Sequence, residues 1–188
     1  MDATTYKQLR AFAAQYGAAV GLIWIASFAF YVIGLTRPLV GNLALLTGLL
    51  SIVAAGLLLR RFRQEVCPLR FWQTWWMGAL TFMYASVLMA VAQFVYFRYI
   101  DHGQMADAYA AILQQPEAIA MMQGMMPGED VGQAATEVIG LLRTISPIRL
   151  TFEFLIYDLA LGLVLAFPTA WIAWGGSNRP TQRQSPTE

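Results

Sequence analysis

Residues 71–97 read FWQTWWMGALTFMYASVLMAVAQFVYF, a stretch without a single charged side chain. The hydrocarbon core of a bilayer is about 30 Å thick, so a helix rising about 1.5 Å per residue crosses it with roughly 20 apolar residues. Three further stretches meet this condition, at about residues 17–36, 38–59 and 150–174. Because lipid offers backbone groups no hydrogen bonds, segments this long and apolar are predicted to be helices. The sequence therefore predicts an all-α, polytopic membrane protein with four transmembrane helices.

The composition of the whole chain indicates the same class of protein. Of its 188 residues, 58% are hydrophobic and 12% are charged, whereas soluble domains average roughly 45–50% apolar and about 25% charged residues. A net charge of +1 provides no large positive field for nucleic acid. The single cysteine, Cys67, rules out an intramolecular disulfide and a cysteine-based metal cluster. Nucleic-acid-binding proteins and disulfide-rich secreted domains are thereby excluded, no cofactor is indicated, and membrane lipids are the expected surroundings.

The positions of Lys and Arg predict the orientation of the chain, because cytoplasmic loops carry the excess of basic residues. One side of the membrane would hold Lys7, Arg10, Arg60, Arg61, Arg63, Arg70, Arg179 and Arg183. The other side would hold Arg37, Arg98, Arg143 and Arg149, beside Asp101, Asp107, Glu117, Glu129, Asp130 and Glu137. We therefore expect one transmembrane domain, residues 1–174, with both ends in the cytoplasm and residues 98–149 outside. The polar residues 175–188 are predicted to be a disordered cytoplasmic tail.

The outer segment 98–149 is too patterned for a simple loop. Pro116 followed by Glu117 is typical of a helix start, since proline is tolerated in the first turn and a carboxylate suits the helix N-terminus. Met-Pro-Gly at 126–128 indicates a break, and Pro147 marks the approach to the fourth span. The expected elements are short amphipathic helices at about 104–115, 117–125 and 129–144. We expect them to lie on the membrane surface or to cover the bundle.

Two carboxylates interrupt the fourth apolar stretch, Glu153 and Asp158. Ionisable groups inside a membrane segment are rare because a charge in hydrocarbon is costly. The two lie five positions apart and therefore do not share one face of a helix. Glu153 is expected to form an ion pair with Arg98, or else to serve a function. Asp158 is expected either to take part in proton-coupled or ligand-binding chemistry, or to be bonded to one of Gln93, Ser86, Tyr84 and Asn42. Glu153, Asp158, Arg98 and Gln93 form the candidate intramembrane polar site.

The run RRFRQEVCPLRFWQTWW, residues 60–76, combines arginines with tryptophans. Arginine near anionic headgroups and tryptophan at the interface are typical of membrane anchoring. The candidate lipid-headgroup contacts are Arg60, Arg61, Arg63, Arg70, Trp72, Trp75 and Trp76. A plain topology signal and a specific lipid or phosphate site both remain open.

The methionines of MMQGMM, residues 121–126, lie near Met105 and His102 in sequence. Thioether ligands facing an oxidising compartment can bind Cu(I), because soft ligands prefer soft metals. Methionine is also an adaptable apolar residue, which suits a helix against lipid. Apolar packing is the favoured interpretation, and copper binding is the alternative.

Small residues recur at helical spacing in the first two spans. They are Ala13, Gly17 and Gly21 in the first and Ala44, Gly48, Ser51 and Ala55 in the second. Such stripes allow close approach of helix backbones in a bilayer. They predict either contacts within the bundle or an interface between copies of the chain.

The order of these features resembles the family catalogued as domain of unknown function 4199, small inner-membrane proteins of Bacteroidota-type bacteria. The resemblance covers about residues 6–174, and its sharpest part is Arg63–Phe71 leading to Tyr99, Ile100 and Asp101. The chain departs from the family pattern at His102, where the family usually has proline. The resemblance implies a four-helix fold in a bacterial inner membrane, and it implies no activity or catalytic residue.

The sequence contains no nucleophile elbow, P-loop, dinucleotide fingerprint or HExxH motif. This favours a non-enzymatic accessory or scaffold subunit of a membrane complex, with a protein partner or further copies of the chain. The alternative is a homo-oligomeric small transporter or channel that uses the intramembrane carboxylates. A weaker alternative is an intramembrane lipid-modifying enzyme, which predicts a lipid-filled cleft reaching Asp158 or Glu153.

Overall fold

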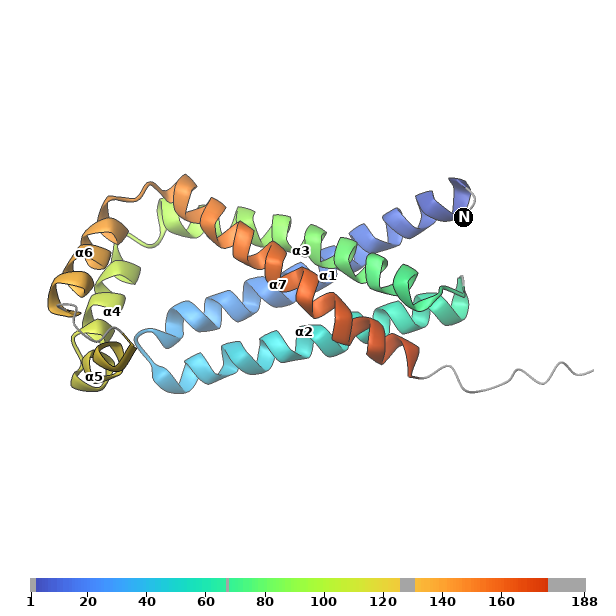
Figure 1. Ribbon diagram of the computed structural model, residues 1–188. Coiled ribbons are helices and arrows are strands. Elements are labelled where there is room, and N and C mark those ends of the chain that lie inside the picture. Colours follow the sequence, from blue (N-terminus) through green and yellow to red (C-terminus); the bar gives the residue numbers. More distant parts are fainter. Residues whose placement is uncertain (1–2, 67, 126–130, 176–188) are drawn as a thin grey trace, which may run out of the picture.

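The structure is a computed structural model that describes residues 3–66, 68–125 and 131–175, and every regular element within these ranges is an α-helix (Figure 1). Four of the helices are long: α1 (Ala3–Gly34), α2 (Pro38–Glu65), α3 (Phe71–Tyr99) and α7 (Pro147–Trp174). Each contains a segment long and apolar enough to cross a membrane. The prediction of an all-α fold with four membrane-spanning helices is confirmed.

The long helices extend beyond the apolar stretches that predict them. α1 already begins at Ala3, α2 continues to Glu65, and α7 begins at Pro147. Hydropathy marks only the part of a helix that suits lipid, whereas Arg, Gln and Glu are good helix formers and let the backbone hydrogen bonds continue beyond it. Proline at the start of a helix is tolerated because its missing N–H would have had no partner there.

The long helices form a bundle in which α1 packs against α2 and α3, and α7 packs against α3 and α2. Figure 1 shows α7 crossing α2 near the C-terminal ends of both helices, and the two moving apart toward the other end of the bundle. At the crossing, a Cβ atom on Gly56 would lie 2.7 Å from Ile172 Cγ2. The absence of a side chain at Gly56 therefore permits the close approach of α2 and α7 near this end of the bundle.

The contact between α1 and α3 depends on a small residue in the same way. A Cβ atom on Gly17 would lie 2.5 Å from Tyr84 Cβ and 2.7 Å from the carbonyl oxygen of Thr81. Ala13, one turn before Gly17, is fully buried. The small-residue stripe of the first span thus lies inside the bundle, as one of the two alternatives predicted.

The middle of the bundle is filled by aromatic rings. Phe82 of α3 is fully buried, and its ring stacks on that of Trp24 in α1 with 5.6 Å between centroids. The indole nitrogen of Trp24 donates a hydrogen bond of 2.9 Å to Ser51 Oγ in α2. This packing joins three of the long helices at one level, and it satisfies the polar edge of a buried tryptophan.

Three short helices form a cap at the end of the bundle where α2 and α7 have separated (Figure 1). They are α4 (Gln104–Leu113), α5 (Pro116–Met125) and α6 (Val131–Thr144), close to the predicted bounds. Arg143 of α6 donates to Asp107 of α4 at 2.7 Å, and the hydroxyl groups of Tyr31 in α1 and Tyr109 in α4 are hydrogen-bonded. The cap is thereby tied to the bundle. The predicted tail from residue 176 on lies outside the described residues, as do residues 129 and 130 of the third predicted short helix.

Candidate functional site

A groove of about 600 Å³ opens on the side of the bundle between α2 and α7. It is lined by α2 from Gly41 to Ile52 and by α7 from Phe154 to Leu165, with residues of α1 and α3 between them. Leu45 and Leu49 on the α2 rim and Leu161 on the α7 rim are all more than half exposed. The groove therefore opens sideways, toward the surface that faces lipid in a membrane, and its walls are mainly apolar.

Asp158 and Gln93 form the main polar feature of this groove. Gln93 Nε2 donates a hydrogen bond of 3.2 Å to Asp158 Oδ2, between α3 and α7. Gln93 is only 1% exposed, and its Oε1 atom has no hydrogen-bond partner among the residues described. Of the four partners that the sequence allowed for Asp158, the structure places Gln93 beside it, whereas Ser86 donates to the carbonyl oxygen of Phe82.

Three further polar side chains line the groove on the α1 side, and the sequence did not single them out. Trp24 donates to Ser51, as described above, and Ser27 Oγ donates to the carbonyl oxygen of Ala44 at 2.8 Å. Tyr31 is bonded to Tyr109 of the cap. Each of these hydroxyl or indole groups is thus already engaged within the protein. Their spacing along α1 follows one helix face, which is the signal that could have found them.

Glu153 and Arg98 lie outside the groove. Both side chains are exposed, and the guanidinium of Arg98 lies over the ring of Tyr99, 5.8 Å from its centroid. Within the described ranges the ion pairs are Arg61–Glu65 and Arg143–Asp107, so no ion pair joins Glu153 to Arg98 there. The structure therefore brings together two of the four residues of the candidate polar site and leaves the other two apart.

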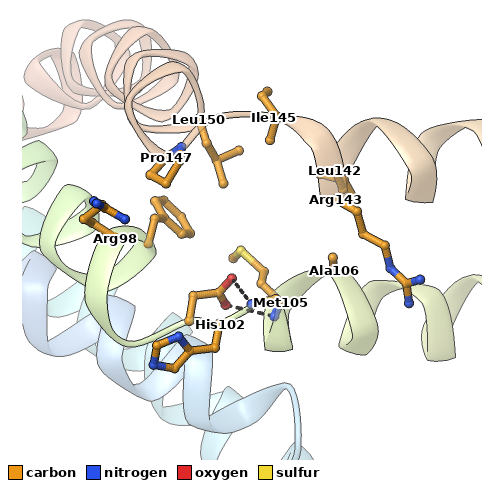
Figure 2. A pocket seen from close by; sticks show the side chains of 12 residues that line it. Arg98, His102, Met105, Ala106, Leu142, Arg143, Ile145, Pro147 and Leu150 are labelled. Carbon is orange, nitrogen blue, oxygen red and sulfur yellow. Dashed lines mark hydrogen bonds between the residues drawn. The ribbon is translucent and has the colours of Figure 1, made fainter.

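A second pocket, of about 320 Å³, lies where the cap meets α3 and α7 (Figure 2). Asp101 fixes the turn beneath it, since its carboxylate accepts hydrogen bonds from the backbone N–H groups of Gly103 at 3.1 Å and Met105 at 2.9 Å. Figure 2 shows Arg98 and Arg143 on opposite sides of this pocket. Its charged groups do not converge on a common point, and Arg143 is held by its bond to Asp107.

The arginines near the end of α2 and before α3, and the tryptophans at the start of α3, have different surroundings. Trp72 and Trp76 are exposed, Trp75 and Arg60 are half-buried, and Arg61 is exposed and pairs with Glu65. The exposed tryptophans suit the interface role that the sequence predicts. The remaining residues of this set are Arg63 and Arg70, of which Arg70 precedes α3 and is exposed.

Arg63 is the exception, because its guanidinium is used inside the protein. Its Nη1 donates a hydrogen bond of 2.6 Å to the carbonyl oxygen of Ala173, and its Nε donates to that of Leu69 at 3.3 Å. The same group lies 4.4 Å from the ring centroid of Trp174. The last carbonyl groups of a helix have no partners within the helix. Arg63 satisfies one of them at the end of α7 and so holds α7 to α2.

Replacing Arg63 with methionine is expected to lower the free energy of unfolding by about 1.5–3 kcal/mol, because it removes charged hydrogen bonds and leaves a carbonyl group of α7 without its partner. Methionine keeps an apolar side chain in place of the aliphatic part of arginine and removes only the guanidinium group. Arg60→Met is the matched control, because within the described residues no hydrogen bond or ion pair involves Arg60. Unfolding by sodium dodecyl sulfate in mixed micelles, followed by circular dichroism, measures both variants. Equal losses in the two variants would contradict the role given to Arg63.

The methionine cluster divides between two places. Met121 and Met125 of α5 are largely exposed, whereas Met105 is buried against the second pocket. Met126 and Cys67 lie outside the described residues. Among the residues described, no group of three or more His, Cys, Asp or Glu side chains is placed to hold a metal ion.

Comparison with known proteins gives one match. A family model described as "Protein of unknown function (DUF4199)" matches residues 15–173. No curated protein and no solved structure matches the chain.

Proposed function

Because this chain belongs to the DUF4199 family of proteins of unknown function, we propose its function from its own groove: it is a non-enzymatic accessory protein of the membrane that holds one amphiphilic molecule between α2 and α7. The observation that carries the proposal is a lateral, apolar groove of about 600 Å³ with a polar pair, Gln93 and Asp158, inside it. Small-molecule sites in proteins are typically apolar clefts of about 300–1,000 Å³ with a few placed polar groups.

The dimensions of the groove suit a slender chain as its occupant. From Gly41 to Ile52 the groove follows α2 for about 17 Å, at about 1.5 Å per residue. A volume of about 600 Å³ along this length is enough for a slender lipid or isoprenoid chain.

The chemistry of the groove supports binding rather than reaction or transport. The partner of Asp158 is an amide, which does not take up or release protons as a general acid or base does. Beyond Ile52 and Leu165, the last groove residues on the two helices, α2 and α7 meet at Gly56 and Ile172. A groove that ends inside the membrane suits a bound molecule better than a transported one. The lipid-modifying enzyme and the transporter are therefore the less supported alternatives.

We further propose that the protein lies in a bacterial inner membrane with both ends in the cytoplasm and the cap outside. The basic residues in the last turns of α2 and just before α3 support this orientation, since they lie at the end of the bundle opposite the cap. The exposed tryptophans Trp72 and Trp76 at that end are suited to the headgroup level.

Filling the groove is expected to reduce retention of the bound molecule strongly. A Cβ atom on Gly48 would meet only Ser27 Oγ within 4 Å, at 3.8 Å, so Gly48→Phe directs a ring into the groove without displacing backbone. Gly140→Phe is the matched control, because a Cβ there meets nothing within 4 Å and the site is in the cap. Native mass spectrometry after mild detergent extraction should find about one amphiphile per chain in the wild type and the control, and a loss of about tenfold in Gly48→Phe.

Equal retention by Gly48→Phe and Gly140→Phe would remove the proposal. The same preparation tests the accessory role, since a complex retains a foreign subunit at a fixed ratio to the chain. A preparation that contains only copies of this chain would instead favour the homo-oligomeric transporter.

A further inference from the structure

Gln93 presents an acceptor that nothing in the described structure satisfies. The side chain lines the groove and is 1% exposed, and its Oε1 atom has no hydrogen-bond partner among the described residues. For an ionised Asp158, the bond from Nε2 to Oδ2 sets the orientation of the amide, because the reversed amide would place Oε1 against an oxygen that has no proton to donate. Buried polar groups are nearly always hydrogen-bonded in proteins, so this acceptor indicates a missing donor.

The protein's own hydroxyl and indole donors around the groove are used elsewhere. Trp24 donates to Ser51, Ser27 donates to the carbonyl oxygen of Ala44, and the hydroxyl of Tyr31 is bonded to Tyr109. In the middle of a membrane, water is not at hand to supply a donor. The donor that Gln93 Oε1 requires has to come with the molecule in the groove.

We infer that the groove selects a hydroxyl-bearing apolar chain, of the class of long-chain alcohols, whose O–H donates to Gln93 Oε1 beside Asp158. The inference rests on the proposed function and names its ligand class. An ester, ketone or ether offers only acceptors and leaves Gln93 Oε1 unpaired.

The position of the polar pair along the groove suits a chain with its hydroxyl inside the membrane. On α7, Asp158 lies about 6 Å along the helix from Phe154 and about 10 Å from Leu165, the two ends of the groove. The hydroxyl therefore lies between apolar walls on both sides. A phospholipid keeps its polar groups at the interface and does not place a donor at this depth.

The test compares probes that differ only in the donor. The full chain is placed in nanodiscs of phosphatidylcholine, a lipid without O–H or N–H groups, and tritiated 1-dodecanol is the tracer in a scintillation proximity assay. Unlabelled 1-dodecanol and dodecyl methyl ether compete with it, and Gly48→Phe gives the background from partition into lipid. The alcohol is expected to compete at least about tenfold better than the ether, because the ether leaves a buried acceptor unpaired. Competition by the two within twofold of each other overturns the inference.

Variants assign the selectivity to the amide. Gln93→Met keeps the volume and removes Oε1, so the preference for the alcohol is expected to fall to about twofold or less. Ser86→Ala is the matched control, a buried polar residue of α3 outside the groove, and it should keep the full preference. The comparison of the two probes in the wild type decides the inference even if Gln93→Met does not fold.

The outcomes separate this inference from the proposed function. If alcohol and ether bind equally well and Gly48→Phe binds neither, the groove holds apolar chains without the selectivity inferred here. If the wild type binds the tracer no better than Gly48→Phe does, the inference fails, and the mass spectrum of the extracted protein then decides whether the proposed function fails with it. A preference for the alcohol that persists in Gln93→Met overturns the role of Oε1.

Discussion

Replacing Phe82 with alanine is expected to lower the free energy of unfolding by about 3–5 kcal/mol, the range for truncating a fully buried phenylalanine. The ring is fully buried, stacks on Trp24 and lies beneath α7, where a Cβ atom on Gly162 would come within 2.8 Å of Phe82 Cβ. Helices in a bilayer gain little from the hydrophobic effect and depend on packing contacts, so a cavity at this point weakens α1, α3 and α7 together. Unfolding in mixed micelles by sodium dodecyl sulfate, followed by circular dichroism, measures the change.

Phe152→Ala is the control for the cavity at Phe82. Phe152 is 57% exposed on α7, so its removal is expected to change the free energy of unfolding by less than about 0.5 kcal/mol. A loss at Phe82 no greater than that at Phe152 would show that the middle of the bundle is not packed as the structure has it.

Replacing Gly17 with leucine is expected to destabilise the protein by about 3 kcal/mol or more, the upper range for overpacking. The new side chain would have to occupy the space of Tyr84 Cβ and of the Thr81 carbonyl group, and backbone cannot move aside as a flexible side chain can. The expected result is loss of the contact between α1 and α3. Cysteine crosslinking between these two helices, on a Cys67→Ser background, should fall together with the unfolding free energy.

Gly140→Leu separates the effect of position from the effect of leucine itself. A Cβ atom on Gly140 meets nothing within 4 Å, and leucine is a better helix former than glycine, so this control should be neutral or slightly stabilising. Should Gly17→Leu match this control, the close packing of α1 against α3 would be refuted.

The four spans could be predicted from the sequence because lipid offers no hydrogen bonds to the backbone, so a long apolar segment in a bilayer has to form a helix. A run such as residues 71–97 has no alternative to a helix in hydrocarbon, and the structure has α3 there. The outer breaks at Pro116 and Pro147 were predictable for a similar reason, since proline fixes the start of a helix. The ends of the helices are harder to predict, because residues there can be helical in lipid or in water. Hydropathy marks where the lipid ends and not where the helix ends.

The groove could not be predicted, because it depends on the angle between two helices. Its rims are ordinary apolar faces in the sequence, and the groove exists because α2 and α7 meet near Gly56 and Ile172 and lie apart toward the cap. The sequence identified Asp158 as unusual and named Gln93 among four partners. Nothing in the sequence indicated that the Oε1 atom of Gln93 would have no hydrogen-bond partner among the described residues.

The short motif that carried the family resemblance has a structural explanation at both of its ends. Arg63 holds the last turn of α7, and Asp101 fixes the turn from α3 into α4. His102, which follows Asp101, has a φ of 43°, a value that proline does not adopt. The turn at His102 is therefore built differently in this chain from a turn with proline at the same position.

The contact between Gly56 and Ile172 also determines how the groove can be reached. Since α2 and α7 are joined there and separate toward the cap, the groove is open on the cap side of this crossing and closed beyond it. A molecule that lies in the bilayer can then reach the groove by lateral diffusion, without first passing through water. Loading of the protein is therefore expected to depend on how deep in the bilayer a molecule places its chain, and not only on its abundance.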